Sequence, residues 1–197
     1  MNKIRLAVLI SGRGSNLQAI IDACAAPDFP AYIEVVISNI PEAYGLERAR
    51  LAGITTRVVS HKEYSDREAF DAALDEIIAS YSIDLICLAG FMRILTPRFV
   101  IKWQGRLINI HPSLLPKYKG LHTHERAIEA GDLESGCSVH YVSAAVDEGD
   151  IILQRSVPIC KGDTADDLAA RVLEQEHQAY PEAIHHIATK ILQKNTT

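Results

Sequence analysis

The sequence predicts an α/β fold, a doubly wound and mostly parallel sheet with helices on both faces. Apolar segments of strand length alternate with segments of helical spacing along nearly the whole chain, and glycine-rich or polar segments follow several of the strands. Strands that alternate with helices at this spacing are typical of parallel βαβ units. We find no internal repeat and no linker rich in Gly, Ser or Pro, so residues 1–197 are expected to form one domain.

The first half of the chain is expected to hold four strands separated by three helices. The apolar runs that predict the strands are Leu6–Ile10, Ile33–Ser38, Thr56–Val59 and Leu85–Ala89. The helices are predicted from apolar spacing over Leu17–Cys24, over about Tyr44–Ala52 and over Phe70–Tyr81. Ser65 or Asp66 could cap the third helix, because both side chains can accept a hydrogen bond from a free N–H of its first turn.

The second half begins with Thr96-Pro97, a cap followed by proline that predicts a helix start. Three further strands and a loop with two prolines and a glycine follow, and Thr164 is expected to cap a C-terminal helix that Pro181 kinks or restarts. The predicted strands are Leu107–His111, Ser138–Val142 and Ile151–Val157, the ordered loop is Pro112–His124, and a short helix is expected over about Glu125–Ala130.

Composition favours a cytoplasmic enzyme. The net charge of −5 and the pI near 5.9 disfavour a nucleic-acid backbone as partner. No segment approaches the roughly 20 consecutive apolar residues that cross a membrane, and the short apolar run near the N-terminus does not resemble a signal peptide. The cysteines lack Cys-x-x-Cys spacing and are expected to be buried and reduced. They are Cys24, Cys87, Cys137 and Cys160.

A glycine-rich turn, Ser11–Asn16, joins the first predicted strand to the first helix. Glycine permits a tight turn, and a helix start offers free N–H groups to an anion. Leu17 stands where a dinucleotide fingerprint needs its last glycine, and a Walker lysine is missing, so one phosphate monoester is the expected ligand. The alternative is a structural turn with Ser15 as the helix cap.

The strand Leu107–His111 alternates, so Asn109 and His111 are expected on one face, roughly 6.5 Å apart. An amide donor and an imidazole at this distance can act on one carbonyl, by oxyanion stabilisation and proton transfer. A structural histidine is the alternative. Asp147 lies in an acidic, glycine-containing segment that is either a solvated turn or the source of a carboxylate that orients His111.

Two further polar features are open to interpretation. His122 and His124, with His140, suggest a metal site, but they supply too few ligands, and a hydrogen-bonded loop without metal is the expected structure. Glu176 continues an apolar stripe of the C-terminal helix, so it should have a partner, either within the protein or on a polar ligand.

On these motifs the chain resembles the phosphoribosylglycinamide formyltransferases, a folate-dependent formyltransferase family. The matching segments are Ile10–Ile20 (ISGRGSNLQAI), Leu88–Leu95 (LAGFMRIL), Asn109–Pro116 (NIHPSLLP), Gly120–His124 (GLHTH) and Asp147–Ile152 (DEGDII). Asn-Ile-His-Pro-Ser-Leu-Leu-Pro is shared with formyltetrahydrofolate hydrolase and with methionyl-tRNA formyltransferase, which are the alternative functions. The motif Ser-Gly-x-Gly-Ser-Asn resembles that of the family branch that acts on glycinamide ribonucleotide.

The resemblance implies a role for each matching position. Asn109, His111 and Asp147 correspond to the catalytic residues, while Gly14, Ser15, Asn16 and Glu176 would bind the ribonucleotide. The folate would contact Arg67, Met92, Arg93, Ile94, Leu95, Ser143, Ala144, Ala145, Val146 and Asp147. Ser143-Ala144-Ala145 replaces a commonly more polar, acidic stretch.

The implied reaction transfers the formyl group of 10-formyltetrahydrofolate to the amino group of glycinamide ribonucleotide, in purine biosynthesis. The phosphate and ribonucleotide would bind to the N-terminal half of the domain, and the folate and catalytic residues would belong to the C-terminal half. No metal is expected, and neither nucleic acid nor membrane is an expected partner. The resemblance is compatible with a monomer or a homodimer.

Overall fold

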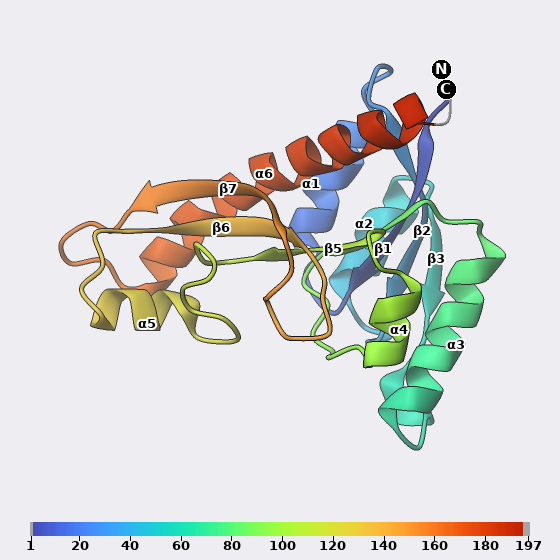
Figure 1. The fold of residues 1–197 in the computed structure, drawn as a ribbon, viewed down its shortest axis with the longest axis horizontal. Coiled ribbons are helices and arrows are strands. Elements are labelled where there is room, and N and C mark those ends of the chain that lie inside the picture. The colour runs from blue at the N-terminus through green and yellow to red at the C-terminus, as the bar shows by residue number, and fades with distance from the viewer. Residues whose placement is uncertain (1, 195–197) are drawn as a thin grey trace.

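The computed structural model describes residues 2–194, and within them one sheet has the strand order β3-β2-β1-β4-β5-β6-β7 (Figure 1). Strands β1 to β5 are parallel to one another, whereas β6 is antiparallel to both β5 and β7. The predicted doubly wound, mostly parallel α/β fold is therefore confirmed. The strands are β1 (Ile4–Ile10), β2 (Ala31–Ser38), β3 (Thr55–Val58), β4 (Leu85–Leu88), β5 (Leu107–His111), β6 (Glu134–Tyr141) and β7 (Ile151–Pro158).

Helices cover both faces of this sheet. Alternate residues of β1 are buried on opposite sides, so Leu6 and Val8 pack in the cluster with α1, α2 and α6, while Ala7 and Leu9 pack with α3 and α4. A parallel strand that is buried on both faces needs this continuous apolar sequence. The helices are α1 (Ser15–Cys24), α2 (Tyr44–Leu51), α3 (Arg67–Ser80), α4 (Pro97–Lys102), α5 (Thr123–Glu129) and α6 (Ala165–Lys194), with a 3-10 turn η1 (His61–Glu63).

Side-chain caps fix several helix starts where the sequence predicts them. Asp66, rather than Ser65, accepts from the backbone N–H of Ala69 at 2.8 Å and begins α3. Thr96 caps α4 ahead of Pro97. Thr164 accepts from the N–H of Asp167 at 3.2 Å, directly before α6. Each cap satisfies a donor that the first helical turn leaves free.

The prediction that Pro181 interrupts the last helix is partly wrong, because α6 neither ends nor restarts there and continues to Lys194. Proline removes one backbone donor from a helix. The apolar face of α6 stays buried on both sides of the proline, with Tyr180 and Ile184 fully inaccessible to solvent. Tertiary burial therefore outweighs the local disruption.

Pairing in the antiparallel part moves two other predicted boundaries. Strand β6 begins at Glu134 rather than at Ser138, since residues 134–137 pair with residues 155–158 of β7. The short helix α5 begins at Thr123, two residues before the expected start, after His122 in the left-handed conformation.

The cysteines are only partly as expected. All four are free, and Cys87 and Cys137 are buried; burial raises the pKa of the Cys137 thiol to about 12. Cys160, however, is exposed, so the prediction of a buried thiol is wrong there. It lies in the turn after β7, where its backbone N–H donates to Asp163. No helix within residues 2–194 is long and apolar enough to cross a membrane.

Tyr180 ties α6 to the centre of the sheet, which gives a test of the packing. Its buried hydroxyl donates to the Leu88 carbonyl at 2.8 Å and lies 3.3 Å from the Ile108 carbonyl. Tyr180→Phe should lower the free energy of unfolding in urea by about 1–2 kcal/mol, because a buried hydrogen bond to the Leu88 carbonyl is lost. Tyr44→Phe, at an exposed position, is the control. Equal losses in the two variants would mean that the hydroxyl contributes nothing specific.

Candidate active site

The glycine-rich turn after β1 has the geometry of an anion-binding helix start. Gly14 is the residue before α1 and has φ +70°, a left-handed angle that favours glycine. Ser15 is the first helical residue, so it is not the cap of the structural alternative, and Gly14 makes no side-chain cap. The first N–H groups of α1 have no partner within the helix and can bind an anion.

A second glycine, Gly45 in the first turn of α2, determines where this loop lies. A Cβ atom on Gly14 would come within 2.7 Å of the Cα of Gly45, and the N–H of Gly45 donates to the Gly12 carbonyl at 3.0 Å. Two backbones therefore meet with no side chain between them. Local sequence patterns do not reveal this contact, because the two glycines are 31 positions apart.

Asn16 and Glu176 meet beside this loop. The Asn16 amide donates to Oε2 of Glu176 at 2.6 Å, which gives Glu176 the partner expected from its position on the apolar stripe. Burial raises the pKa of Glu176, and the hydrogen bond from Asn16 offsets only part of that effect. The Oδ1 of Asn16 is buried without a hydrogen-bond partner within the described residues, so it is available to a ligand.

Asn109 and His111 lie on one face of β5, as the alternation predicts, while Ile108 and Ile110 pack in the core. Nδ2 of Asn109 lies 3.3 Å from Nε2 of His140, its cross-strand neighbour on β6. From the sequence, His140 is a candidate only for a metal ligand. Its position beside Asn109 depends on the register of β5 and β6, which a single sequence does not reveal.

Asp147 approaches both histidines from the loop between β6 and β7. Its carboxylate lies 3.4 Å from Nδ1 of His111 and 3.6 Å from Nε2 of His140, and it accepts from the Gly120 N–H at 3.0 Å. Its side chain is 10% exposed. A solvated turn residue would have neither this burial nor these partners, so that alternative does not describe Asp147.

These partners keep the Asp147 carboxylate ionised. Burial alone would raise its pKa, but the hydrogen bonds from His140 and the Gly120 N–H, together with the charge of His111, outweigh burial and lower the pKa. The other ring nitrogen of His111, Nε2, lies 2.9 Å from the Tyr118 carbonyl. Both nitrogens therefore face acceptors, and only a doubly protonated ring can donate to both.

The predicted folate segment after β4 is partly exposed, and a contact with α3 holds its end. Met92 and Ile94 are more than half exposed, whereas Leu95 is buried. The N–H of Thr96 donates to Asp71 of α3 at 2.6 Å, which fixes the end of the segment. The guanidinium of Arg93 lies 5.9 Å from the centre of the Phe70 ring. Arg67, the predicted contact for the folate tail, begins α3 and is exposed.

The loop predicted to surround the pterin precedes Asp147. Ala144, Ala145 and Val146 are exposed, and the Ser143 hydroxyl donates to the Ala145 carbonyl at 2.9 Å. Asp147 itself has φ +52°. The loop therefore turns at Asp147 and directs its carboxylate inward, while the apolar side chains before it face solvent.

The histidines of the Gly120–His124 segment do not form a metal centre with other groups. No cluster of three or more His, Cys, Asp or Glu side chains suited to a metal occurs between residues 2 and 194. His122 is exposed and lies 3.6 Å from Glu125. Burial lowers the pKa of His124; the charge of Glu125 opposes this shift, and that of His111 adds to it.

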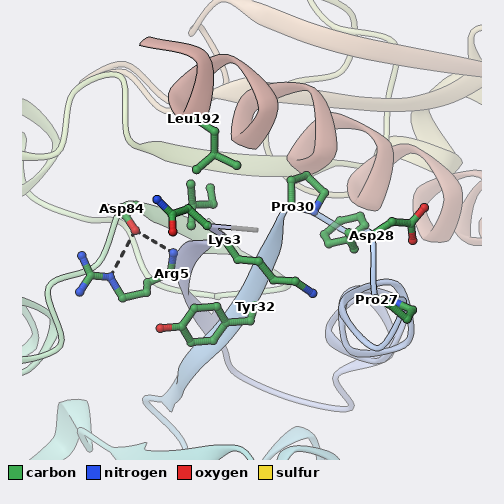
Figure 2. A pocket seen from close by; sticks show the side chains of 11 residues that line it. Lys3, Arg5, Pro27, Asp28, Pro30, Tyr32, Asp84 and Leu192 are labelled. Atoms are coloured by element: carbon green, nitrogen blue, oxygen red, sulfur yellow. Dashed lines mark hydrogen bonds and ion pairs between the residues drawn. The ribbon is translucent and has the colours of Figure 1, made fainter. Parts of the chain in front are cut away.

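A separate cavity of about 620 Å³ lies at the other edge of the sheet, where β1 and β2 begin (Figure 2). Figure 2 shows that Arg5 and Asp84 form an ion pair in its wall, with an Nε–Oδ2 distance of 3.3 Å, and that Tyr32 and Leu192 line it. None of the predicted site residues lines this cavity. The candidate active site is therefore the surface at the carboxyl ends of the central strands.

Residues 4–184 match the formyl transferase family profile. The chain belongs to the formyl transferase family. It is 53% identical to phosphoribosylglycinamide formyltransferase of Escherichia coli over 94% of this chain and 87% of that protein. A phosphoribosylglycinamide formyltransferase structure from Brucella melitensis is 48% identical, with a TM-score of 0.91, and the match covers 95% of this chain and 96% of that one.

The formyl transferase region also occurs within longer proteins. The chain is 52% identical to the trifunctional purine biosynthetic protein adenosine-3 of Bos taurus over 95% of this chain, and it spans only 18% of that protein. The other activities implied by the name of that protein are therefore not transferred to this chain.

The raised pKa of Glu176 predicts how its substitution changes stability with pH. The folded state holds the Glu176 proton more tightly than the unfolded chain, in which a glutamate has a pKa of about 4.3. The free energy of unfolding therefore falls as the pH rises from about 4.3 to above the raised pKa of the folded state. Glu176→Gln removes this loss. Its stability relative to the unaltered protein should therefore increase between pH 4 and pH 8 in urea denaturation.

Glu174→Gln, at an exposed position of the same helix, is the control and should show no such trend. A Glu176→Gln variant that becomes relatively less stable as pH rises would contradict the assigned direction.

Proposed function

We propose that this formyl transferase moves the formyl group of 10-formyltetrahydrofolate to the amino group of glycinamide ribonucleotide, in purine biosynthesis. The observation that carries the proposal is the Asp147–His111 pair, with a 3.4 Å contact, beside Asn109 at the carboxyl edge of the sheet. The names of the E. coli and B. melitensis relatives support the same reaction.

The ribonucleotide phosphate is proposed to bind at the start of α1, to Gly14, Ser15 and Asn16. The left-handed Gly14 and the free N–H groups of the first turn suit one phosphate group. Glu176 would accept from hydroxyl groups of the ribonucleotide, and the unpartnered Oδ1 of Asn16 offers a second acceptor nearby. This pair of acceptors suits a sugar, whose hydroxyls are donors.

The folate is proposed to lie between the segment after β4 and the loop before Asp147. Met92, Ile94 and Val146 expose apolar surface there, and Leu95 and Val142 of the same two segments pack against one core cluster. A flat ring with polar edges suits such a site, since apolar side chains cover its faces and backbone groups bind its edges. Arg93, Ser143, Ala144 and Ala145 would supply backbone contacts, and Arg67 would lie near the tail. The bound folate supplies the formyl group.

Two side chains, Asn109 and His111, are proposed to act on the reacting group, and Asp147 acts through its contact with His111. The Asn109 amide donates to the negative oxygen that develops when the substrate amine attacks. The His111 ring lies between the Asp147 carboxylate and the Tyr118 carbonyl, and it stabilises the same oxygen and delivers a proton to the leaving nitrogen. To contact the substrate, one ring nitrogen of His111 must give up its acceptor within the protein. Of the two acceptors, the Tyr118 carbonyl is uncharged and is therefore the one that the substrate replaces.

The remaining predictions about this chain follow from the same proposal. Within a single domain, the ribonucleotide would bind mainly to the N-terminal half, with Glu176 from the C-terminal half. The folate and the catalytic residues would belong mainly to the C-terminal half, with Arg67 and Met92–Leu95 from the N-terminal half. A cytoplasmic location, the lack of a nucleic-acid or membrane partner, a reaction without metal, and a monomer or homodimer stay predictions.

The reaction should proceed only when both substrates are present, followed by the absorbance change of the folate product. Folate product without the ribonucleotide would indicate a formyltetrahydrofolate hydrolase, and formylation of methionyl-tRNA would indicate the tRNA enzyme. A chelator should leave the rate unchanged. Loss of activity that zinc restores would overturn the metal-free reaction.

Asp147→Asn should lower kcat by more than about tenfold, with little change in either KM, because it removes a charge needed in the transition state. His111→Ala added to Asp147→Asn should cost much less than the product of the two single losses, as for residues that act together. Asp150→Asn, three positions along at an exposed site, is the control. If the losses of kcat at Asp147 and His111 multiply independently, the two residues do not act together and the proposed pair is wrong.

The lowered pKa of Asp147 adds a pH readout to the same variant. Its ionised form stabilises the folded state above the unfolded pKa of about 3.9, and this contribution disappears as pH falls through the folded pKa. The stability difference between the unaltered protein and Asp147→Asn should therefore be present at pH 7 and shrink in acid.

A further inference from the structure

Ser11, the first residue of the glycine-rich loop, connects that loop to the predicted folate segment. The pairing of β1 with β4 continues past the strands through two backbone hydrogen bonds. The Ala89 N–H donates to the Leu9 carbonyl at 2.9 Å, and the Ser11 N–H donates to the Gly90 carbonyl at 3.1 Å. The two segments thus leave the sheet side by side.

The backbone ladder stops at Gly90, and the Ser11 side chain takes its place. Gly90 has φ +74°, which turns the chain out of the strand direction. Two residues after Gly90, the Met92 N–H donates to the Ser11 hydroxyl oxygen at 2.7 Å. The start of the Met92–Leu95 segment is therefore held by a side chain of the phosphate loop.

The direction of this contact determines the rest of a polar chain. A backbone N–H only donates, so the Ser11 oxygen accepts from Met92 and its own hydrogen is free for Oδ1 of Asn39, 2.5 Å away. Asn39 is buried at the end of β2, and its amide nitrogen lies 3.1 Å from Nδ1 of His61. The buried Asn39 thus orients the serine hydroxyl so that its oxygen accepts from the folate segment.

We propose that Ser11 is a positioning residue for the folate, although it belongs to the loop that binds the ribonucleotide. Its hydroxyl fixes the Met92 backbone, and thereby the segment whose backbone groups would bind the pterin edge. The two substrate sites then share one structural element, and a change at Ser11 appears mainly in folate binding. The inference rests on the proposed function, because it takes Met92–Leu95 as the folate segment.

Ser11→Ala tests this role, because it deletes the hydroxyl and keeps the backbone bond to Gly90. The Kd of tetrahydrofolate, measured by calorimetry without ribonucleotide, should rise about three- to tenfold, the usual effect of one lost hydrogen bond. The KM for the formyl folate should rise similarly, and the KM for the ribonucleotide should stay within about twofold. Ser11→Thr, which keeps a hydroxyl, should restore most of the folate affinity.

Two further variants separate positioning from general damage. Asn39→Ala removes the acceptor that orients the Ser11 hydroxyl, so it should weaken folate binding in the same direction and by less. Ser80→Ala deletes an exposed hydroxyl at the end of α3, where it donates to the Ile77 carbonyl, and should change the affinity for neither substrate. Circular dichroism and urea denaturation establish that each variant is folded.

The outcomes distinguish the two proposals. Unaltered folate affinity in a folded Ser11→Ala variant, or a loss of affinity for the ribonucleotide only, overturns the role of Ser11 and leaves the proposed function standing. Failure of the unaltered protein to bind tetrahydrofolate overturns the proposed function, and the inference with it.

Discussion

The adjacency of β1, β4 and β5 is the constraint on which the rest of the site depends. The chain builds β2 and β3 outward from β1 and then returns across the sheet to place β4 against the other side of β1. The next strand, β5, extends the sheet in that direction and is parallel to β4. The carboxyl ends of all three therefore share one edge, where ligands of open α/β sheets bind. Loops that are distant in the sequence, after Ile10 and after Leu88, leave the sheet beside each other.

Two buried carboxylates at this edge show opposite electrostatic behaviour for a simple reason. Asp147 has two imidazoles and a backbone N–H as neighbours, and these overcome the cost of burial. Glu176 has one neutral amide as its partner, so burial dominates. The surroundings, rather than the residue type, separate a carboxylate that is stably ionised from one that ionises at a cost. Ionisable pairs of this kind often mark functional sites.

Local sequence signals predicted the features that depend on neighbours along the chain. The apolar runs, the caps at Asp66 and Thr96, and the common face of Asn109 and His111 all follow from propensity and alternation. The helix that continues through Pro181 could not be predicted this way, since its stability comes from packing against the sheet.

Contacts between segments that are distant in the sequence could likewise not be predicted from local signals. The loop that carries Asp147 follows an antiparallel strand, so the rule for parallel strand ends does not place it. The neighbour of Asn109, His140, is determined by strand register. To predict the contact between Ser11 and Met92, one would need to know both the strand order and the turn at Gly90. The family resemblance named most of the candidate residues, but it did not name these supporting contacts.

The close approach of Gly14 and Gly45 has a practical consequence for protein engineering. Replacing a helical glycine with alanine usually increases stability, because alanine restricts the unfolded chain and favours the helix. Gly45 looks like such an opportunity, since it lies in the first turn of α2 and has no positive φ. Its added methyl group would, however, lie 2.5 Å from Cδ1 of Ile10 and 3.3 Å from the Cα of Gly14. A stabilisation programme guided by helix propensity alone would thus select a substitution that crowds the Ile10 side chain and the glycine-rich loop.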